Sequence, residues 1–451
     1  MKRLLCLALL LSATAFGADP PEPGTCNLES LIRSARTFNP DLNVLDAQTD
    51  ETRAATETTR ANLGPMLTLS GYSRVVSVVP EMTQADRTVT TPMGSFTIPG
   101  GTQQLGDYDS HSVDLEFRQT LYTGGRLRGA VAVAESMTQT ASEQHQAAQF
   151  ALDGQVAAAY FSLIRLTDIH RIAEMSLAVA RAHAEDVRNR ADAGALTANE
   201  TLKADLRVSE AEQSVLSAHN QIRTIQSRLK QLCGIESDFE ITRGDFEPID
   251  VPEPDPAEAL GTALSHRREL TVQEAQLEAA RRERDLASRE SRPTIGVFAR
   301  ASYGKPGPDF VRNDWIDSFS AGLNIAWPAW DNGRTSAGTS RAEARIRRVE
   351  AQINALKSTI TRDVETALIE LDDTRARLAV ADRAVIQAEE QFRMTADRFH
   401  EGTLTNTDYL DAEIALSRER VNHVITRTDL MLAWVRYLLV TGRDILEELH
   451  P

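Results

Sequence analysis

Apolar and polar residues alternate along four stretches of the chain, at about residues 66–76, 111–122, 294–303 and 318–329. In the second stretch, Val113, Leu115 and Phe117 alternate with polar or charged residues. A period of two predicts β-strands that have one apolar and one polar face. Pro65 and Pro293 stand just before the first and third stretches and favour an extended start there. About ten residues is also the length that a tilted strand needs to cross a bilayer.

Most of the remaining sequence has apolar residues at spacings of three and four, which predicts helices. The expected helices lie at about residues 28–62, 126–192, 197–232, 256–291, 335–400 and 405–440. The second of them would be roughly 100 Å long at ~1.5 Å per residue, and its mixed spacing is typical of interrupted coiled-coil packing. Short loops containing Gly194 and Gly402 would turn each long helix back on the next, and we expect positive φ angles at these glycines.

The chain contains two copies of one unit. Residues 121–234 match residues 329–442 at a constant offset of 208 without a gap. Upstream, Pro65 corresponds to Pro293 at an offset of 228 (293 − 65), so the first copy carries a 20-residue insertion (228 − 208), which we place in an outer loop between its two strands. A repeat this long is a half-domain, because solenoid repeats have periods of roughly 20 to 50 residues. We expect a first repeat at residues 18–236, a linker at 237–255, a second repeat at 256–445 and a tail at 446–451.

The first 17 residues have the pattern of a secretory signal peptide, with Lys2 and Arg3, an apolar run and small residues at its end. We expect this segment, residues 1–17, to be removed. No later stretch reaches the ~18 to 20 consecutive apolar residues of a membrane-spanning helix. If the mature chain crosses a membrane, we expect it to do so with strands closed into a barrel, because open sheet edges are not satisfied in lipid.

The formal net charge of −16 argues against nucleic acid as a partner. Two cysteines, Cys26 and Cys233, follow the signal segment, and secreted proteins form disulfides. A disulfide between them and two unrelated buried thiols are both compatible with the sequence. The histidines are scattered without metal-ligand spacing, and no phosphate-binding loop or nucleophile motif is present, so we expect neither an enzyme nor a bound metal or cofactor.

Three segments resemble signatures of the TolC family of outer-membrane efflux proteins. Two of them are strand-to-helix segments, residues 119–126 and 327–334, and the third is residues 399–413. The signature residues of the first two segments are Gly124, Gly125, Arg126, Gly333 and Arg334. The resemblance implies a mainly helical fold with a membrane β-barrel. In it, three identical chains each contribute four strands to a 12-stranded barrel and long antiparallel coiled-coil helices to a tunnel.

The resemblance also implies a location and partners. Such a homotrimer lies in the outer membrane of a Gram-negative cell, surrounded by outer-membrane lipid, and extends into the periplasm. It would act as the exit duct of a tripartite system by docking to a periplasmic adaptor protein and an inner-membrane transporter. Efflux of drugs, toxic compounds or metal ions and type I protein secretion both stay open, because the inner-membrane partner selects the cargo. A periplasmic scaffold or adaptor that does not span the membrane is an alternative of another class, and the duplicated strand pairs argue against it.

By the same resemblance, Asp408 and Asp411 match aspartates that ring the periplasmic aperture, and Glu200 is the counterpart of Asp408 in the first repeat. Six such aspartates in a trimer would attract cations and raise one another's pKa, which predicts a cation-selective gate. A structural alternative exists for two of these acids. Thr405 with Asp408, and Thr197 with Glu200, have the spacing of a helix-capping box. Asp411 has no such alternative role.

The predicted tip departs from the best-known family member. Leu404 stands where a tip arginine helps to lock the closed state, and Phe399 stands where a constriction tyrosine would lie. Arg190 and Arg398, which precede the two tip loops, either replace that lock or are solvated surface charges. The loops themselves are candidates for adaptor docking.

Overall fold

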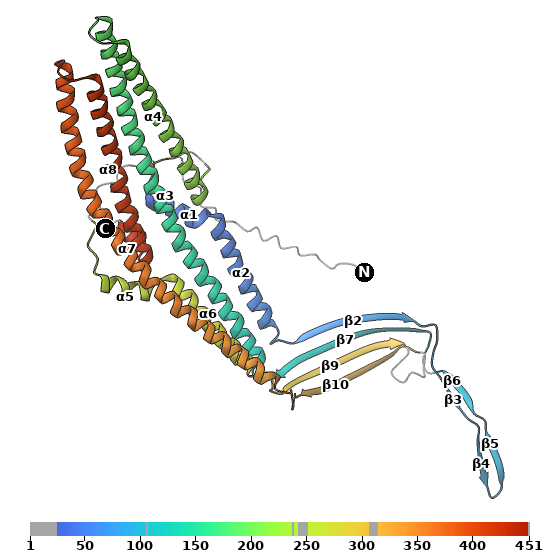
Figure 1. The fold of residues 1–451 in the computed structure, drawn as a ribbon. Helices are drawn as coiled ribbons and strands as arrows, with labels where there is room; N and C mark the ends of the chain where they lie inside the picture. Colours follow the sequence, from blue (N-terminus) through green and yellow to red (C-terminus); the bar gives the residue numbers. More distant parts are fainter. Residues whose placement is uncertain (1–24, 105–106, 237–238, 242–250, 306–313, 450–451) are drawn as a thin grey trace. The chain divides into compact units, whose positions relative to one another are not determined.

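The computed structural model describes residues 25–104, 107–236, 239–241, 251–305 and 314–449 (Figure 1). The predicted signal peptide and most of the predicted linker lie outside these residues. The chain divides into two compact units. The first comprises Met1–Ala47, Glu143–Val272 and Ile353–Pro451, and the second comprises Gln48–Ser142 and Gln273–Gln352.

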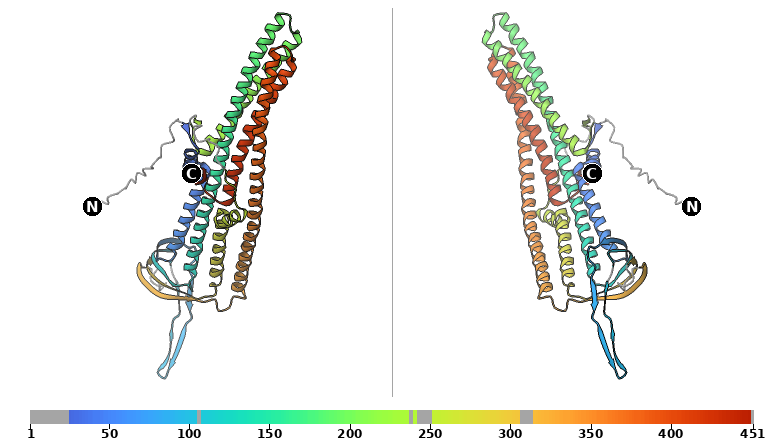
Figure 2. Two further views of the ribbon diagram at one scale, coloured as in Figure 1. Left: turned by 90° about the vertical axis from the view of Figure 1, so that its left-hand side faces the viewer. Right: turned by 90° about the vertical axis from the view of Figure 1, so that its right-hand side faces the viewer.

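The two longest helices, α3 (Arg126–Asp192) and α7 (Arg334–His400), contain 67 residues each. The helices that follow them, α4 (Ala198–Cys233) and α8 (Asn406–Thr441), contain 36 residues each. Both pairs of helices start 208 residues apart (334 − 126 and 406 − 198), which is the offset of the sequence repeat. In the first unit the α3–α4 hairpin lies beside the α7–α8 hairpin (Figure 2). The duplication inferred from the sequence is therefore present in the helices.

The prediction of single helices at 28–62 and 256–291 is wrong, because each is broken in two. The first consists of α1 (Leu28–Phe38) and α2 (Pro40–Ala61), and the second of α5 (Pro256–His266) and α6 (Arg268–Ala287). Asn39 has an extended ψ of 124°, as expected before a proline. Its side-chain oxygen accepts hydrogen bonds from the backbone of Asp41 and Leu42 at 2.9 and 3.2 Å, so Asn39 also caps the new helix.

The second unit contains an antiparallel sheet with the strand order β10-β9-β7-β2. Its strands are β2 (Met66–Val75), β7 (Asp109–Tyr122), β9 (Thr294–Lys305) and β10 (Ile316–Ala326). All four predicted strands are present. The last one ends at Ala326 and not near residue 329, because Pro328 lacks the N–H that a ladder requires. The apolar face is exposed, with Leu69 at 73% and Leu323 at 66% exposure.

The sequence predicted only these four strands, and that number is too low. β1 (Thr25–Cys26) pairs in parallel with β8 (Glu240–Ile241). The insertion carries two short antiparallel ribbons, and the second ribbon lies within the connection between the two strands of the first (Figure 1). The ribbon strands are β3 (Glu81–Gln84), β4 (Arg87–Thr91), β5 (Gly94–Ile98) and β6 (Gly101–Gln104). Strands of two to five residues are too short to give a reliable alternation signal.

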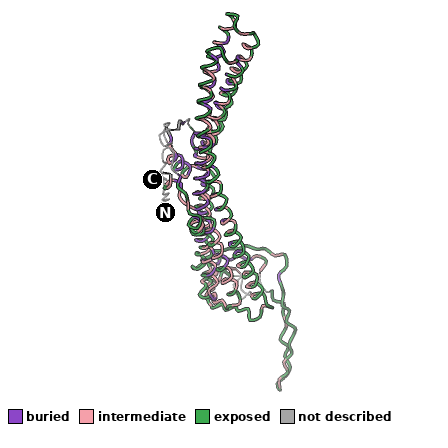
Figure 3. The backbone as a smooth tube through the Cα atoms, turned by 60° about the vertical axis from the view of Figure 1, so that its left-hand side comes forward, coloured by how far each residue is buried: buried purple, intermediate pink, exposed green. Residues whose placement is uncertain are grey.

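Burial is concentrated in the helices, while the strands of the second unit are mostly exposed (Figure 3). Fully buried side chains in the first unit include Val156, Leu163, Leu371 and Leu438. Among the described residues, none of the helices combines the length and the apolar character that crossing a bilayer requires.

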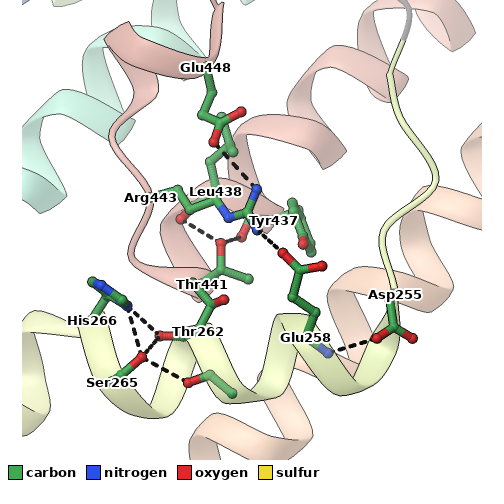
Figure 4. A network of polar contacts seen from close by, with 11 residues as sticks. Asp255, Glu258, Thr262, Ser265, His266, Tyr437, Leu438, Thr441, Arg443 and Glu448 are labelled. Atoms are coloured by element: carbon green, nitrogen blue, oxygen red, sulfur yellow. Dashed lines mark hydrogen bonds and ion pairs between the residues drawn. The ribbon is translucent and has the colours of Figure 1, made fainter.

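A short helix, α9 (Ile445–Leu449), occupies most of the predicted C-terminal tail at residues 446–451. It follows Gly442, which ends α8 with a φ of +75°. A Cβ at this glycine would lie 2.8 Å from the backbone oxygen of His266. Arg443 then binds Glu258 of α5 at 3.1 Å and Glu448 of α9 at 3.4 Å (Figure 4). These contacts fasten the end of α8 to α5.

Candidate functional site at the helix tips

The loops at the tips of the two hairpins have the same backbone geometry. Gly194 and Gly402 have φ angles of +76° and +75°, which confirms the positive values expected from the sequence. The amide of Ala195 donates to the carbonyl of Arg190 at 2.9 Å, and that of Thr403 donates to the carbonyl of Arg398 at 3.0 Å. This pattern closes the last turn of a helix. The tips therefore present the starts of α4 and α8 in equivalent ways.

The predicted capping box at the start of α8 is confirmed. The amide of Asp408 donates to the Thr405 hydroxyl at 3.2 Å. The Asp408 carboxylate accepts from the backbone N–H and hydroxyl of Thr405 at 3.0 and 2.6 Å. These hydrogen bonds from Thr405 lower the pKa of Asp408. The carboxylate is exposed, so the cap keeps a negative charge at the surface of the tip.

The equivalent prediction for Glu200 is wrong, because Thr197 makes no side-chain capping bond. The Glu200 carboxylate instead accepts from the amide of Asn406 at 2.9 Å and from the ammonium of Lys203 at 3.1 Å. The hydrogen bond from Asn406, followed by the effect of Lys203, lowers the pKa of Glu200. Since Asn406 is the first residue of α8, Glu200 links the two hairpins.

Asp411 lies one turn beyond Asp408 on α8 and is exposed. Among the described residues it has neither a hydrogen-bond partner nor an ion-pair partner for its carboxylate. The two aspartates thus differ in their environment. Asp408 is held in place by its helix cap, whereas the structure gives no structural role to the carboxylate of Asp411.

A buried aromatic cluster joins the hairpins behind these acids. We call it the tip cluster, and it consists of His183, Phe399, Asn406 and Tyr409. The His183 ring stacks on Tyr409 with centroids 3.9 Å apart and an angle of 9°, and it lies 5.1 Å from the Phe399 ring. Its Nε2 is 2.6 Å from Oδ1 of Asn406. Phe399, which the sequence analysis placed at the expected constriction, is 2% exposed and belongs to the core.

Burial lowers the pKa of His183, against the opposing effect of the hydrogen bond that its ring donates to Oδ1 of Asn406. Three charged or titratable groups also act on it: Asp186 and Arg190 from α3, and His400 from α7. The sequence analysis did not identify this histidine. Its position four residues after Val179 and four before Val187, on the apolar stripe of α3, is the signal that marks it as inward-facing.

Arg190 contacts the tip cluster, so the interpretation of Arg190 as a solvated surface charge is wrong. Its guanidinium lies 4.8 Å from the Phe399 ring centroid and donates to the Phe399 carbonyl at 3.3 Å. It also pairs with Asp186 at 3.0 Å. Arg398 is exposed, and among the described residues its side chain has no polar partner. Leu404 is half-buried in the loop.

Below the tip cluster, a buried ion pair joins three helices. The Glu413 carboxylate of α8 accepts from Arg207 of α4 at 2.7 Å and from Ser176 of α3 at 2.5 Å. Arg207 also donates to Ser176 at 3.1 Å. The side chains of Arg207 and Glu413 are 13% and 6% exposed. The sequence analysis missed this network, because no local pattern connects residues so far apart in the chain.

The strand-to-helix segments in the second unit turn through glycines that have positive φ angles. Gly124 and Gly125 have φ angles of +62° and +85°, and Gly333 has +80°. A Cβ at Gly124 would lie 2.2 Å from that of Arg292, whose guanidinium donates to the Gly124 carbonyl at 2.9 Å. The arginines of the two signatures, Arg126 and Arg334, are the first residues of α3 and α7.

Cys26 and Cys233 are both buried and are not joined by a disulfide bond. Burial raises the pKa of Cys233 to about 12, with a smaller contribution from Cys26. The sequence left open a disulfide or two buried thiols, and the structure contains two buried thiols. Within the described residues, no group of three or more histidine, cysteine, aspartate or glutamate side chains is arranged to hold a metal ion.

Known proteins are similar to this chain in sequence and in architecture. The profile of the family described as outer membrane efflux protein matches residues 31–235 and 259–443. The outer membrane protein TolC of Vibrio cholerae serotype O1 is 24% identical over 438 residues, which cover 96% of this chain and 94% of the relative. The outer membrane efflux protein BepC of Brucella suis biovar 1 is 23% identical over 359 residues, or 79% of this chain and 77% of the relative. The crystal structure of the outer membrane protein VceC from Vibrio cholerae has a TM-score of 0.70 at 21% identity, covering 92% of this chain and 96% of VceC.

The profile covers most of both repeats, and the solved structures share the fold. Proteins of this kind are the outer-membrane components of tripartite efflux or secretion systems, in which they work with an adaptor and an inner-membrane transporter. They are channels of the Gram-negative outer membrane and not enzymes, which confirms the corresponding expectations from the sequence. On the matched profile, the duplicated helices and the four-stranded sheet, this chain belongs to the outer membrane efflux protein family.

Proposed function

We propose that this chain is the exit duct of a tripartite efflux system and that it closes at its helix tips. Family membership supports the duct. The observation that carries the gate is the exposed pair Asp408 and Asp411 at the start of α8. The cap lowers the pKa of Asp408, and Asp411 is unpaired within the described residues. Three copies around a pore would bring six carboxylates together and favour cations over anions.

The sheet supports a trimer with a shared barrel. Its apolar face is exposed on β2 and β10, where Leu67, Leu69, Leu323 and Ile325 are 66% to 73% exposed. Lipid would cover this face in a membrane. Within the chain, β2 and β10 are the edge strands. Three copies would pair these edges and give a closed barrel of 12 strands, which leaves no edge open to lipid.

The contacts between hairpins support a closed state of the tip. Glu200 bound to Asn406, the tip cluster, Arg190 on Phe399 and the pair Arg207–Glu413 all join the α3–α4 hairpin to α7 or α8. Opening the pore by separating the hairpins would break these contacts. Arg190 would thus substitute for the tip arginine that Leu404 replaces, and Glu200 would act as a link between hairpins.

The gate is tested by single-channel recording in planar bilayers. Asp408→Asn keeps an acceptor for the Thr405 cap, so it removes charge with little effect on the fold. We expect the wild type to pass a cation-selective current and the double variant Asp408→Asn, Asp411→Asn to lose most of this selectivity. Asp372→Asn, an exposed acid in the middle of α7, is the matched control and should leave selectivity unchanged. Equal reversal potentials in the wild type and the double variant would place the gate elsewhere.

For the cargo, we propose small molecules such as drugs, toxic compounds or metal ions, with an adaptor protein docking at the tip loops. Protein secretion is the alternative. A strain lacking this protein would become sensitive to small toxic compounds in the first case. In the second case, it would lose a protein from its culture medium without a change in sensitivity. The scaffold alternative does not fit the outer-membrane family to which the chain belongs.

A further inference from the structure

The sheet of the second unit lines a cavity of about 550 Å³, and most of the lining residues belong to its polar face. It lies near the ends of the strands that lead into the helices. Its polar-face lining consists of Glu116, Arg118, Thr120, Gly296, Phe298 and Asn324. These residues come from three neighbouring strands: β7, β9 and β10.

An aromatic ring lies among the polar residues of this cavity. Phe298 is opposite Arg118 of β7 and Gly322 of β10 in the strand register. A Cβ at Gly322 would lie 2.9 Å from the Phe298 ring, so the ring occupies the space that this glycine leaves. Two residues earlier in β9, Gly296 has no side chain to fill the cavity. Phe298 remains 37% exposed, which makes its ring accessible to a solute.

Guanidinium groups cover the carboxylates beside this ring. Arg118 is 65% exposed, while Glu116, to which its Nε is bonded, is 25% exposed. Arg300 is 49% exposed, while its partner Asp114 is 6% exposed. Among the described residues, Glu116 is the one polar partner of the Arg118 side chain, so the outer nitrogens of Arg118 remain available as donors. An arginine fork matches a carboxylate in shape and charge.

We propose that this cavity binds aromatic carboxylates, with the ring of the solute against Phe298 and its carboxylate on Arg118. The site rests on the proposed function, because the polar face lines a lumen only in a closed barrel, where a trimer would have three copies. A cation would meet the exposed guanidinium groups of Arg118 and Arg300, so the site discriminates by charge as well as by shape. Because Arg118 is open to water and is already paired, we expect weak binding, with half-saturation at about 1 to 10 mM. Weak binding allows a transported solute to dissociate from the site and leave the duct.

The test is block of the single-channel current by 2-naphthoate in planar bilayers. Phe298→Ala and Arg118→Gln should each raise the half-blocking concentration about three- to tenfold. Gly322→Ala keeps both residues but displaces the ring, and should have a similar effect. Glu116→Gln removes the carboxylate that competes for Arg118 and should lower the half-blocking concentration. Arg74→Gln, on the same face at the other end of β2, is the control and should match the wild type.

Two related probes separate the parts of the site. Acetate has the charge without the ring, and 2-naphthylmethylammonium has the ring with the opposite charge; both should block more weakly than 2-naphthoate. Equal block of the wild type, Phe298→Ala and Arg118→Gln, or stronger block by the ammonium probe, overturns the proposal. If the protein conducts no current at all, the proposed duct function fails. Saturation-transfer NMR of 2-naphthoate with the detergent-solubilised wild type and Phe298→Ala then tests the cavity separately, and an equal signal from the two proteins rejects it.

Discussion

Replacing Arg207 by methionine should open the helix tips. The change leaves the Glu413 carboxylate, which is 6% exposed, with Ser176 as its remaining partner among the described residues. Breaking a buried ion pair by removing one partner costs about 3 to 5 kcal/mol. This cost destabilises the proposed closed state, in which the hairpins are packed together. The open state avoids it, because the carboxylate between separated hairpins would be hydrated. The closed state would then lose a factor of roughly 10² to 10³·⁵ relative to the open one.

The assay is the open probability of single channels, recorded under the same conditions for the wild type, Arg207→Met, and the double variant Arg207→Met, Glu413→Met. We expect the single variant to be open for much of the recording. The double variant should return towards the wild type, because replacing a buried ion pair by apolar residues of similar volume is often neutral or stabilising. A single variant that stays closed, or a double variant as open as the single one, would refute the reasoning that this pair holds the hairpins together.

Three further predictions use matched changes. Burial lowers the pKa of His183 from its ordinary 6.5, so the tip cluster keeps its full stability above about pH 6.5 and loses it as the pH falls below that value. When the pH is lowered from 7.5 to 5, the open probability should therefore rise in the wild type and stay constant in His183→Gln. Thr405→Ala should cost about 0.5 to 2 kcal/mol of unfolding free energy and Thr197→Ala close to nothing, because Thr405 makes a capping bond and Thr197 does not. Thermal unfolding followed by circular dichroism measures this difference, and equal changes in the melting temperature of the two variants would contradict it. Gly442→Ala should lower the melting temperature because of its positive φ and the nearby backbone, whereas Gly261→Ala, within α5 and with open space around it, should leave it equal or higher.

Regular features with a long period could be predicted from the sequence. The ungapped offset of 208 residues predicted equal lengths for α3 and α7. Both helices could be recognised because every turn of a long helix repeats the same spacing of apolar residues. The break at Asn39 was missed but could have been predicted from the sequence, since an asparagine before a proline both ends one helix and caps the next. The pairing of β1 with β8 was not, because two-residue strands are specified by contacts distant in the sequence.

The tip shows why the site was predicted only in part. Thr405–Asp408 and Thr197–Glu200 have the same spacing, yet only the first pair forms a capping box. The difference lies in Asn406, which binds Glu200 from the other hairpin. Such a competitor is visible only after the hairpins are packed together. His183 and Glu413 were missed for the same reason, because their partners lie more than 200 residues away.

The equal lengths of the paired helices have a consequence for any ring-shaped partner. Three chains with two hairpins each would present six tips of the same length and loop geometry to the periplasm. The tips are alike in shape and different in chemistry, since Lys203 in one repeat occupies the place of Asp411 in the other. A partner with six equal subunits could contact all six tips, but its subunits would meet in turn Lys203, which is paired with Glu200, and Asp411, which has no partner among the described residues. The duplication would thus impose an alternating pattern of two kinds of contact on a partner that is itself uniform.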